Sequence, residues 1–291
     1  SYEKYDTSDK YSISTYTLDW QNNRRDLFWG YPGNLEDVTD YGVSFKKRSG
    51  DFKGDIESEE LSARLGRKIG FDQYVLLNVG LHNLTYKNKE SSHATYNLKY
   101  QLKRKEFNIQ LMFDHNLYFI EKGVTTPLTD SLKQDYVEAR FNYLGKKNFR
   151  IPISVKSSSI SDSNKSNQQK IAVLYGRSYP TWIWGGYGVE RLSFSKKVTG
   201  YWSPKKVLSH GPRIEVGHTF MEKLNLGGSY SYSFNKEDSF AEGKSIYASL
   251  KTEYGRRENW LTGLSYYISK SKQGTSNWRG EGVRAYLNIS F

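Results

Sequence analysis

The sequence predicts an all-β fold: an antiparallel transmembrane β-barrel of the bacterial outer membrane. Apolar residues recur at every second position, over runs about as long as the ~9–11 residues that a tilted strand needs to cross a membrane. No stretch approaches the ~18 consecutive apolar residues of a spanning helix. The last alternating run ends on the aromatic residue Phe291, which is typical of outer-membrane barrels.

The composition fits a barrel with a polar interior. Only 36% of the 291 residues are hydrophobic, while 15% are aromatic, including 24 tyrosines, and there is no cysteine. A soluble core of this size normally needs more aliphatic residues. A membrane barrel does not, because only every second strand residue faces lipid and the lumen stays wet.

The alternation predicts strands along the whole chain. Its regular runs are 94–102, 224–234, 246–254, 260–268 and 283–291. Less regular candidates are 11–20, 40–48, 58–68, 74–87, 106–117, 133–144, 148–157, 167–176, 182–195 and 208–220. Because single-chain bacterial barrels have even strand numbers, we predict a sixteenth strand near Val198 to Tyr201, with fourteen strands as the alternative.

Polar connections separate these runs. Residues 157–168, 235–243 and 270–278 are rich in Lys, Ser, Asp and Asn and are predicted to be extracellular loops. Residues 145–148, 103–106 and 255–258 are predicted to be short periplasmic turns. A soluble β-sandwich or propeller would also alternate, but ten-residue strands favour the membrane barrel, and no repeat of ~40 residues is found.

We expect residues 1–291 to form a single barrel domain, the C-terminal part of a longer protein. The chain starts at Ser1 without a Met, so any export signal is expected to have been removed or to lie upstream. The alternating Leu287, Ile289 and Phe291 are typical of the C-terminal signal that the barrel-assembly machinery reads.

A turn in the C-terminal half carries a family resemblance. Gly200, Tyr201, Trp202, Ser203 and Pro204 precede a strand and then a Gly-rich aromatic strand. This segment, 199–235, resembles the C-terminal barrels of outer-membrane exopolysaccharide export proteins, such as the cellulose and poly-N-acetylglucosamine secretion subunits. The resemblance implies a sixteen-stranded porin after a periplasmic tetratricopeptide-repeat scaffold, a polysaccharide substrate, and a periplasmic scaffold or synthase complex as partner.

The strand parity opposite the apolar one predicts the lumen. It carries more basic than acidic side chains, which favours anionic solutes, and tyrosines that could stack on sugar rings. The predicted substrate path consists of Arg64, Lys68, Lys99, Lys103, Arg140, Arg213, Glu215, Tyr247, Lys251, Glu253, Tyr267, Arg284 and Tyr286, with Glu138 among them. Alternatively, these charges pair across neighbouring strands, or the net charge of +12 lies on loops that bind lipopolysaccharide phosphates.

The leading hypothesis is export of a secreted polysaccharide, and the alternative is a porin for small solutes. A third hypothesis, a barrel phospholipase or protease, rests on the adjacent Asp114 and His115, whose side chains should point to opposite faces. We predict no enzyme activity, cofactor or metal site, and no nucleic-acid binding, because the charges form no stripe. Trp182 and Trp184 are predicted to belong to an interfacial aromatic girdle, with a sugar-stacking platform as the alternative.

Overall fold

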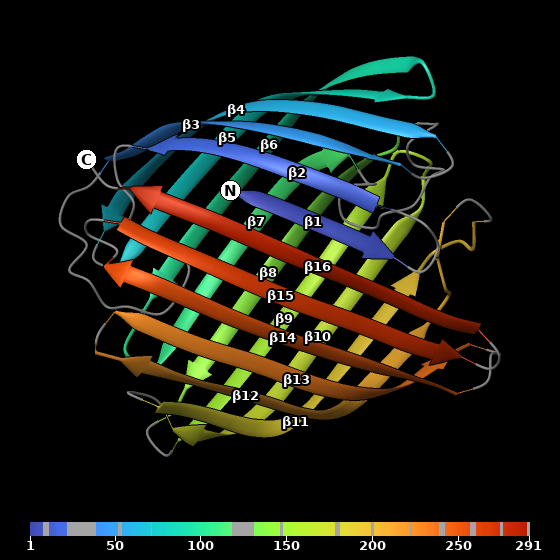
Figure 1. The fold of residues 1–291 in the computed structure, drawn as a ribbon. Helices are drawn as coiled ribbons and strands as arrows, with labels where there is room; N and C mark the ends of the chain where they lie inside the picture. Colours follow the sequence, from blue (N-terminus) through green and yellow to red (C-terminus); the bar gives the residue numbers. More distant parts are fainter. Residues whose placement is uncertain are drawn as a thin grey trace.

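The computed structural model is a closed barrel of sixteen antiparallel strands, as the sequence predicts (Figure 1). It describes residues 1–7, 12–21, 39–51, 54–70, 72–117, 131–145, 148–177, 181–198, 201–221, 223–238, 242–256, 260–273 and 276–289. Gly200 and Phe291, two residues of the predicted turn and assembly signal, lie outside these ranges. Within them, no helix is long and apolar enough to cross a membrane.

The strands follow one another around the barrel in chain order. The first eight are β1 (Tyr2–Thr7), β2 (Ser12–Gln21), β3 (Thr39–Asp51), β4 (Asp55–Gly70), β5 (Gln73–Tyr86), β6 (Lys89–Lys103), β7 (Phe107–Leu117) and β8 (Lys133–Leu144). The second eight are β9 (Phe149–Ile160), β10 (Lys165–Arg177), β11 (Thr181–Phe194), β12 (Val207–Phe220), β13 (Leu224–Glu237), β14 (Gly243–Arg256), β15 (Trp260–Gln273) and β16 (Ser276–Ile289).

The sixteenth strand is not where the sequence predicts it. Val198 and Tyr201 lie in the connection between β11 and β12, whereas the additional strand is β1 at the N-terminus. β1 closes the barrel by pairing with both β16 and β2, as Figure 1 shows. Its sequence, YEKYDT, has no apolar stripe, so periodicity did not reveal it.

The apolar parity faces outward. Leu18, Phe45, Leu61 and Leu81 are directly paired along β2, β3, β4 and β5, and all four are exposed. Leu287 and Ile289 continue this outer face on β16, with exposed fractions of 59% and 43%. An apolar surface that surrounds a closed barrel is unfavourable in water, and it matches the lipid-facing belt of outer-membrane barrels.

The two ends of the barrel differ. At one end the strands are joined mostly by turns of two to four residues, such as those after β4, β6, β8 and β12. The longest connection, 22–38, also lies at this end. The other end carries the connections 118–132 and 195–206, and we assign it as the cell-surface end because all the connections at the first end except 22–38 are short turns. The predicted loops 157–168 and 270–278 lie at this end, but they are much shorter than expected, because β9, β10, β15 and β16 run through most of both segments.

Candidate functional site: the lumen wall

Contacts that cross whole strands identify the concave face of the sheet. Arg150 Nη1 on β9 donates to Glu215 Oε2 on β12 at 2.9 Å, above the two intervening strands. Tyr267 on β15 likewise donates to Glu3 on β1 at 3.1 Å, across β16. Side chains converge only on the inner surface of a barrel, so this parity lines the lumen.

All thirteen residues of the predicted substrate path lie on this lumen-facing parity. Arg64 pairs in register with Asn78, Lys99 with Met112, and Arg213 with Ser231, each opposite a residue of the inner face. The same face also carries Lys46, Arg48, Arg150, Lys156 and Lys170. Their carboxylate counterparts are Glu3, Asp19, Glu60, Asp114, Glu138, Glu190, Glu215, Glu237 and Glu253. Basic groups therefore outnumber carboxylates on the described lumen face, whereas a role in substrate passage stays a prediction.

Many lumenal charges pair with one another, some along one strand and others between strands, as Lys170 on β10 does with Glu190 on β11 at 3.2 Å. Arg140 pairs with Glu138 at 2.6 Å, Arg213 with Glu215 at 2.6 Å, and Lys251 with Glu253 at 3.0 Å. Each of these three pairs joins residues two positions apart, which share a face of the strand. Such partly exposed pairs contribute at most about 1 kcal/mol each to stability.

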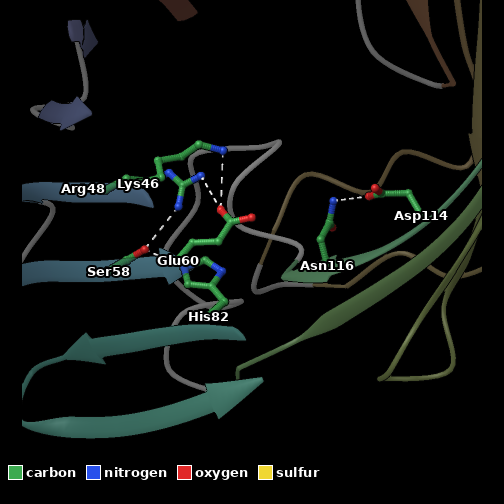
Figure 2. Close-up of polar contacts among 7 residues, drawn as sticks. All are labelled: Lys46, Arg48, Ser58, Glu60, His82, Asp114 and Asn116. Carbon is green, nitrogen blue, oxygen red and sulfur yellow. Dashed lines mark hydrogen bonds and ion pairs between the residues drawn. The ribbon is translucent and has the colours of Figure 1, made fainter. Parts of the chain in front are cut away.

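Two carboxylates are each shared by two cations. Glu60 on β4 lies 3.1 Å from Arg48 Nη2 and 3.5 Å from Lys46 Nζ, both on β3 (Figure 2). Glu215 is held by Arg150 and Arg213 in the same way. Each of these clusters carries a net positive charge, so pairing does not neutralise the wall.

A cavity of about 420 Å³ lies against the inner wall of β2 to β8. Its charged lining groups are Lys46, Arg48, Glu60, Arg64, Lys99 and Asp114, together with Asp19. Asp114 accepts a hydrogen bond from Asn97 at 2.7 Å and another from Asn116, and Figure 2 shows it apart from the Glu60 cluster. Mixed charges with amide groups can hold a solute that is both anionic and rich in hydroxyls.

The opposite wall is aromatic and small-residue-rich. Tyr267 lies over Gly282 and Tyr286 over Gly263, where an added Cβ would meet the rings at 2.4 Å and 2.3 Å. The Tyr286 hydroxyl donates to Glu253, so both tyrosines are held flat by wall carboxylates. Their hydroxyls are engaged, and their ring faces are what they can offer to a sugar.

The girdle prediction for Trp182 and Trp184 is wrong. Both lie on the lumen parity of β11, paired with Gly217 and Glu215, and Trp184 is 8% exposed. Tyr187 and Val189 occupy the outer face instead. Glycines at 185, 186 and 188 leave too few side chains in this strand for periodicity to indicate which face the tryptophans take.

The segment that contains the family turn folds onto the lumen side of the mouth. Tyr201 is 6% exposed and packs with Ile160, Leu192, Phe194 and Val207, which are all lumen-facing strand residues. Ser203 is also buried, whereas Trp202 is exposed. This connection therefore narrows the cell-surface opening, which the sequence did not indicate.

Hydrogen bonds fasten this connection to the turn between β9 and β10. The Tyr201 hydroxyl donates to Asp162 Oδ2 at 2.7 Å and accepts from Asn164 Nδ2 at 2.9 Å. Asn164, fully buried, also accepts from the Lys196 amide at 3.0 Å. Burial raises the pKa of Tyr201, and the adjacent Asp162 carboxylate raises it further.

Neither His115 nor His82 forms an accessible catalytic site. His115 faces outward and binds Asp135 at 2.6 Å, while Asp114 faces the lumen, as adjacent strand residues must. Sequence reasoning missed the pair of Ser58 Oγ and His82 Nε2, 2.5 Å apart. Because Ser58 is 1% exposed and His82 is 0% exposed, no substrate reaches that hydroxyl. No metal-binding group of His and carboxylate side chains occurs among the described residues.

The fold and its lipid-facing belt define the protein as a β-barrel of the bacterial outer membrane. Among solved structures, the chain is similar over its full length to a bacterial polysaccharide outer membrane secretin, with a TM-score of 0.69, 10% identity and 97% of that chain covered. It is less similar to OccK3 and OpdQ of Pseudomonas aeruginosa, each at a TM-score of 0.48, with 9% and 11% identity and 94% and 96% of those chains covered. Comparison of the sequence with protein-family models and with curated proteins finds no match.

Proposed function

We propose that this barrel is an outer-membrane channel for the export of a secreted anionic polysaccharide. The observation that carries the proposal is the excess of basic side chains on the described lumen face, where Glu60 and Glu215 are each shared by two cations. Such a wall lowers the electrostatic barrier for a polyanion. Full-length likeness in fold to a polysaccharide secretin is consistent with this cargo.

The two walls suit different parts of a charged sugar chain. Arg64 and Lys99 line the cavity beside β2 to β8, where they can meet carboxylates or other anionic substituents. Tyr267 and Tyr286 present flat rings on the β15 and β16 wall, where apolar faces of sugar rings can stack. Weak contacts of both kinds let a chain slide, because no single one holds it.

The proposal is tested by conductance of the purified barrel in planar bilayers. In a KCl gradient the channel is expected to prefer chloride, and the triple variant Arg64→Gln, Lys68→Gln, Lys99→Gln should lower this preference at least about twofold. Arg67→Gln is the matched control, because Arg67 lies on β4 between Arg64 and Lys68 but on the outer face.

Cargo size and charge are tested in the same bilayers. An anionic oligosaccharide of about ten sugars should interrupt the current more often than a neutral one of the same length, and the triple variant should remove the difference. Equal effects of the two sugars would contradict an anionic cargo. Passage of small anions with no interruption by either oligosaccharide would instead assign the barrel as a porin for small solutes.

A further inference from the structure

A group of basic side chains lies on the outer surface of the barrel near its cell-surface end. The strands β13 to β16 lie side by side there (Figure 1). At this end of the four strands, the outward-facing basic residues are Lys236, Lys244, Lys270, Lys272 and Arg279, all exposed. We call these five residues the outer basic patch.

Like charges face one another directly within this patch. Lys244 is the register partner of Lys272, and Lys270 is the partner of Arg279. Directly opposed like charges destabilise a pair of strands unless an anion lies between them. Arg279 has such an anion in Glu281, at 2.8 Å, which also accepts from Tyr266. In the described part of the chain, the four lysine ammonium groups have neither an ionic nor a hydrogen-bonding partner.

The patch begins where the apolar belt ends. Lys236 follows Phe234 on the outer face of β13, Lys244 precedes Ile246 on β14, and Lys270 follows Ile268 on β15. This places the ammonium groups one step beyond the hydrocarbon layer, at the level of lipid headgroups. At this end of the barrel the headgroups belong to the outer leaflet.

The outward-facing charges at this end differ between sides of the barrel. At the same end of β3 and β4 the outer face carries Asp51, Asp55, Glu57 and Glu59, with Lys47 paired to Glu59 at 3.1 Å. A general preference for lysine at the rim would not produce this contrast. Single basic residues also face outward at this end on β8, β10 and β11, at Lys133, Lys165 and Arg191. Among the described register pairs of the outer face, however, two basic residues lie directly opposite each other only on β14 to β16.

We propose that the outer basic patch binds the phosphate groups of a phosphorylated glycolipid of the outer leaflet. Lysine ammonium groups bind phosphate oxygens through charge-assisted hydrogen bonds. A lipid with two phosphates could lie between the opposed pairs and relieve both repulsions, while its acyl chains pack on Ile246, Ile268 and Phe234. This lipid site is independent of what passes through the lumen.

The test measures lipid retained by the detergent-purified barrel, by native mass spectrometry. The probes are lipid A with both phosphates and lipid A without phosphates. The wild-type barrel should retain the phosphorylated form preferentially, and Lys244→Gln, Lys270→Gln, Lys272→Gln should lower retention at least about tenfold. The control Lys105→Gln, Arg177→Gln, Lys223→Gln removes three exposed charges from the opposite end and should retain lipid as the wild type does.

Further arms separate the sources of the phosphate. Inorganic phosphate at millimolar concentration should not displace the lipid; displacement would show a free-anion site and overturn the proposal. Equal retention of both lipid A forms, or equal losses in the two triple variants, would also overturn it. If the test variant does not fold, the wild type alone decides, because 1 M NaCl should release phosphorylated lipid A and undiminished retention there would contradict a charge-based site.

Discussion

At the scale of single residues, glycines shape the lumen by receiving aromatic rings. Trp182 on β11 lies over Gly217 on β12 and Gly227 on β13, where an added Cβ would meet its ring at 1.8 Å and 3.1 Å. The ring covers backbone that would otherwise be open, and it is itself partly buried beside Trp184. The tryptophan therefore acts as part of the wall rather than as a membrane anchor.

Gly217→Ala should displace Trp182 from this position. The added methyl has no room beside the ring, and overpacking of this kind costs about 1–3 kcal/mol of unfolding free energy. The midpoint of urea unfolding measures the loss. Gly185→Ala is the control, since nothing lies within 4 Å of the Cβ it would add. Equal midpoints for the two variants would mean that the Trp182 contact contributes nothing.

Ion pairs at this scale explain why net charge alone is a poor guide to a lumen. Arg140 and Lys251 each have a carboxylate two residues away on the same strand, so their charges are largely local dipoles. The cations that share Glu60 and Glu215 are different, because one carboxylate cannot neutralise two of them. The positive field of the wall comes from such unequal clusters.

At the scale of elements, the connection between β11 and β12 lies at the mouth of the barrel. It is held by the Tyr201 hydroxyl, which lies between Asp162 and Asn164, and by Ser203 Oγ, which accepts from the Val198 amide at 2.7 Å. Apolar packing of Tyr201 on Phe194 supplements these bonds. Tyr201 is thus the residue whose side chain fastens this connection to the turn between β9 and β10.

Alkaline pH should open this connection. The folded protein raises the pKa of Tyr201 above its ordinary value near 10, chiefly through burial. Because the pKa is raised, the neutral Tyr201 hydroxyl stabilises the fastened connection at any pH below the ordinary tyrosine pKa. This stabilisation is lost as the pH rises through the raised pKa of the folded protein. Single-channel conductance should therefore increase reversibly above a pH of about 10. Tyr201→Phe, which cannot titrate, should conduct more at neutral pH and lack this increase; an identical pH profile in the variant would refute the role of Tyr201.

The hairpin turns show a simpler link between residue and element. Lys87 and Asn88 join β5 to β6 with φ angles of 48° and 62°, both in the left-handed region. Two such residues make the tight turn whose twist matches that of the flanking strands. This turn keeps the register between β5 and β6, and hence the position of Lys99 on the lumen face.

At the scale of the whole molecule, closure of the sheet decides which charges act together. Arg150 and Glu215 are 65 residues apart, yet they meet over two strands because the wall curves inward. The six-residue strand β1 closes the barrel by pairing with β16 on one side and β2 on the other. The field inside the lumen is therefore a property of the closed barrel, since no single hairpin contains it.

Anion selectivity of the open channel should weaken with salt. The Debye length falls from about 10 Å at 0.1 M to about 3 Å at 1 M, so wall charges act over a shorter part of the lumen. Reversal potentials at the same KCl ratio but at increasing mean concentration measure this effect. The triple variant Arg64→Gln, Lys68→Gln, Lys99→Gln is the control and should show less change. If the anion selectivity does not change with salt concentration, it arises from direct contacts at a narrow point of the lumen and not from the electrostatic field of the wall charges.

The sequence by itself determined the barrel and the parity of most strands, because alternation with period two depends only on local side-chain direction. The number sixteen followed from the rule that such barrels have even strand numbers, since alternation revealed only fifteen strands. The sequence predicted the lumen side for Arg64, Lys99 and Tyr267, whose strands have a continuous apolar face. It did not reveal β1 or the side of Trp182, where neighbouring residues are polar or glycine and the pattern is silent.

Only the tertiary structure decided how lumenal charges combine, where the segment of Tyr201 lies and which basic groups remain on the outer wall. These features depend on contacts between strands far apart in the chain, such as Arg150 with Glu215, and on register, such as Lys244 opposite Lys272. Register and curvature arise from closure of the whole sheet, and no local pattern encodes them.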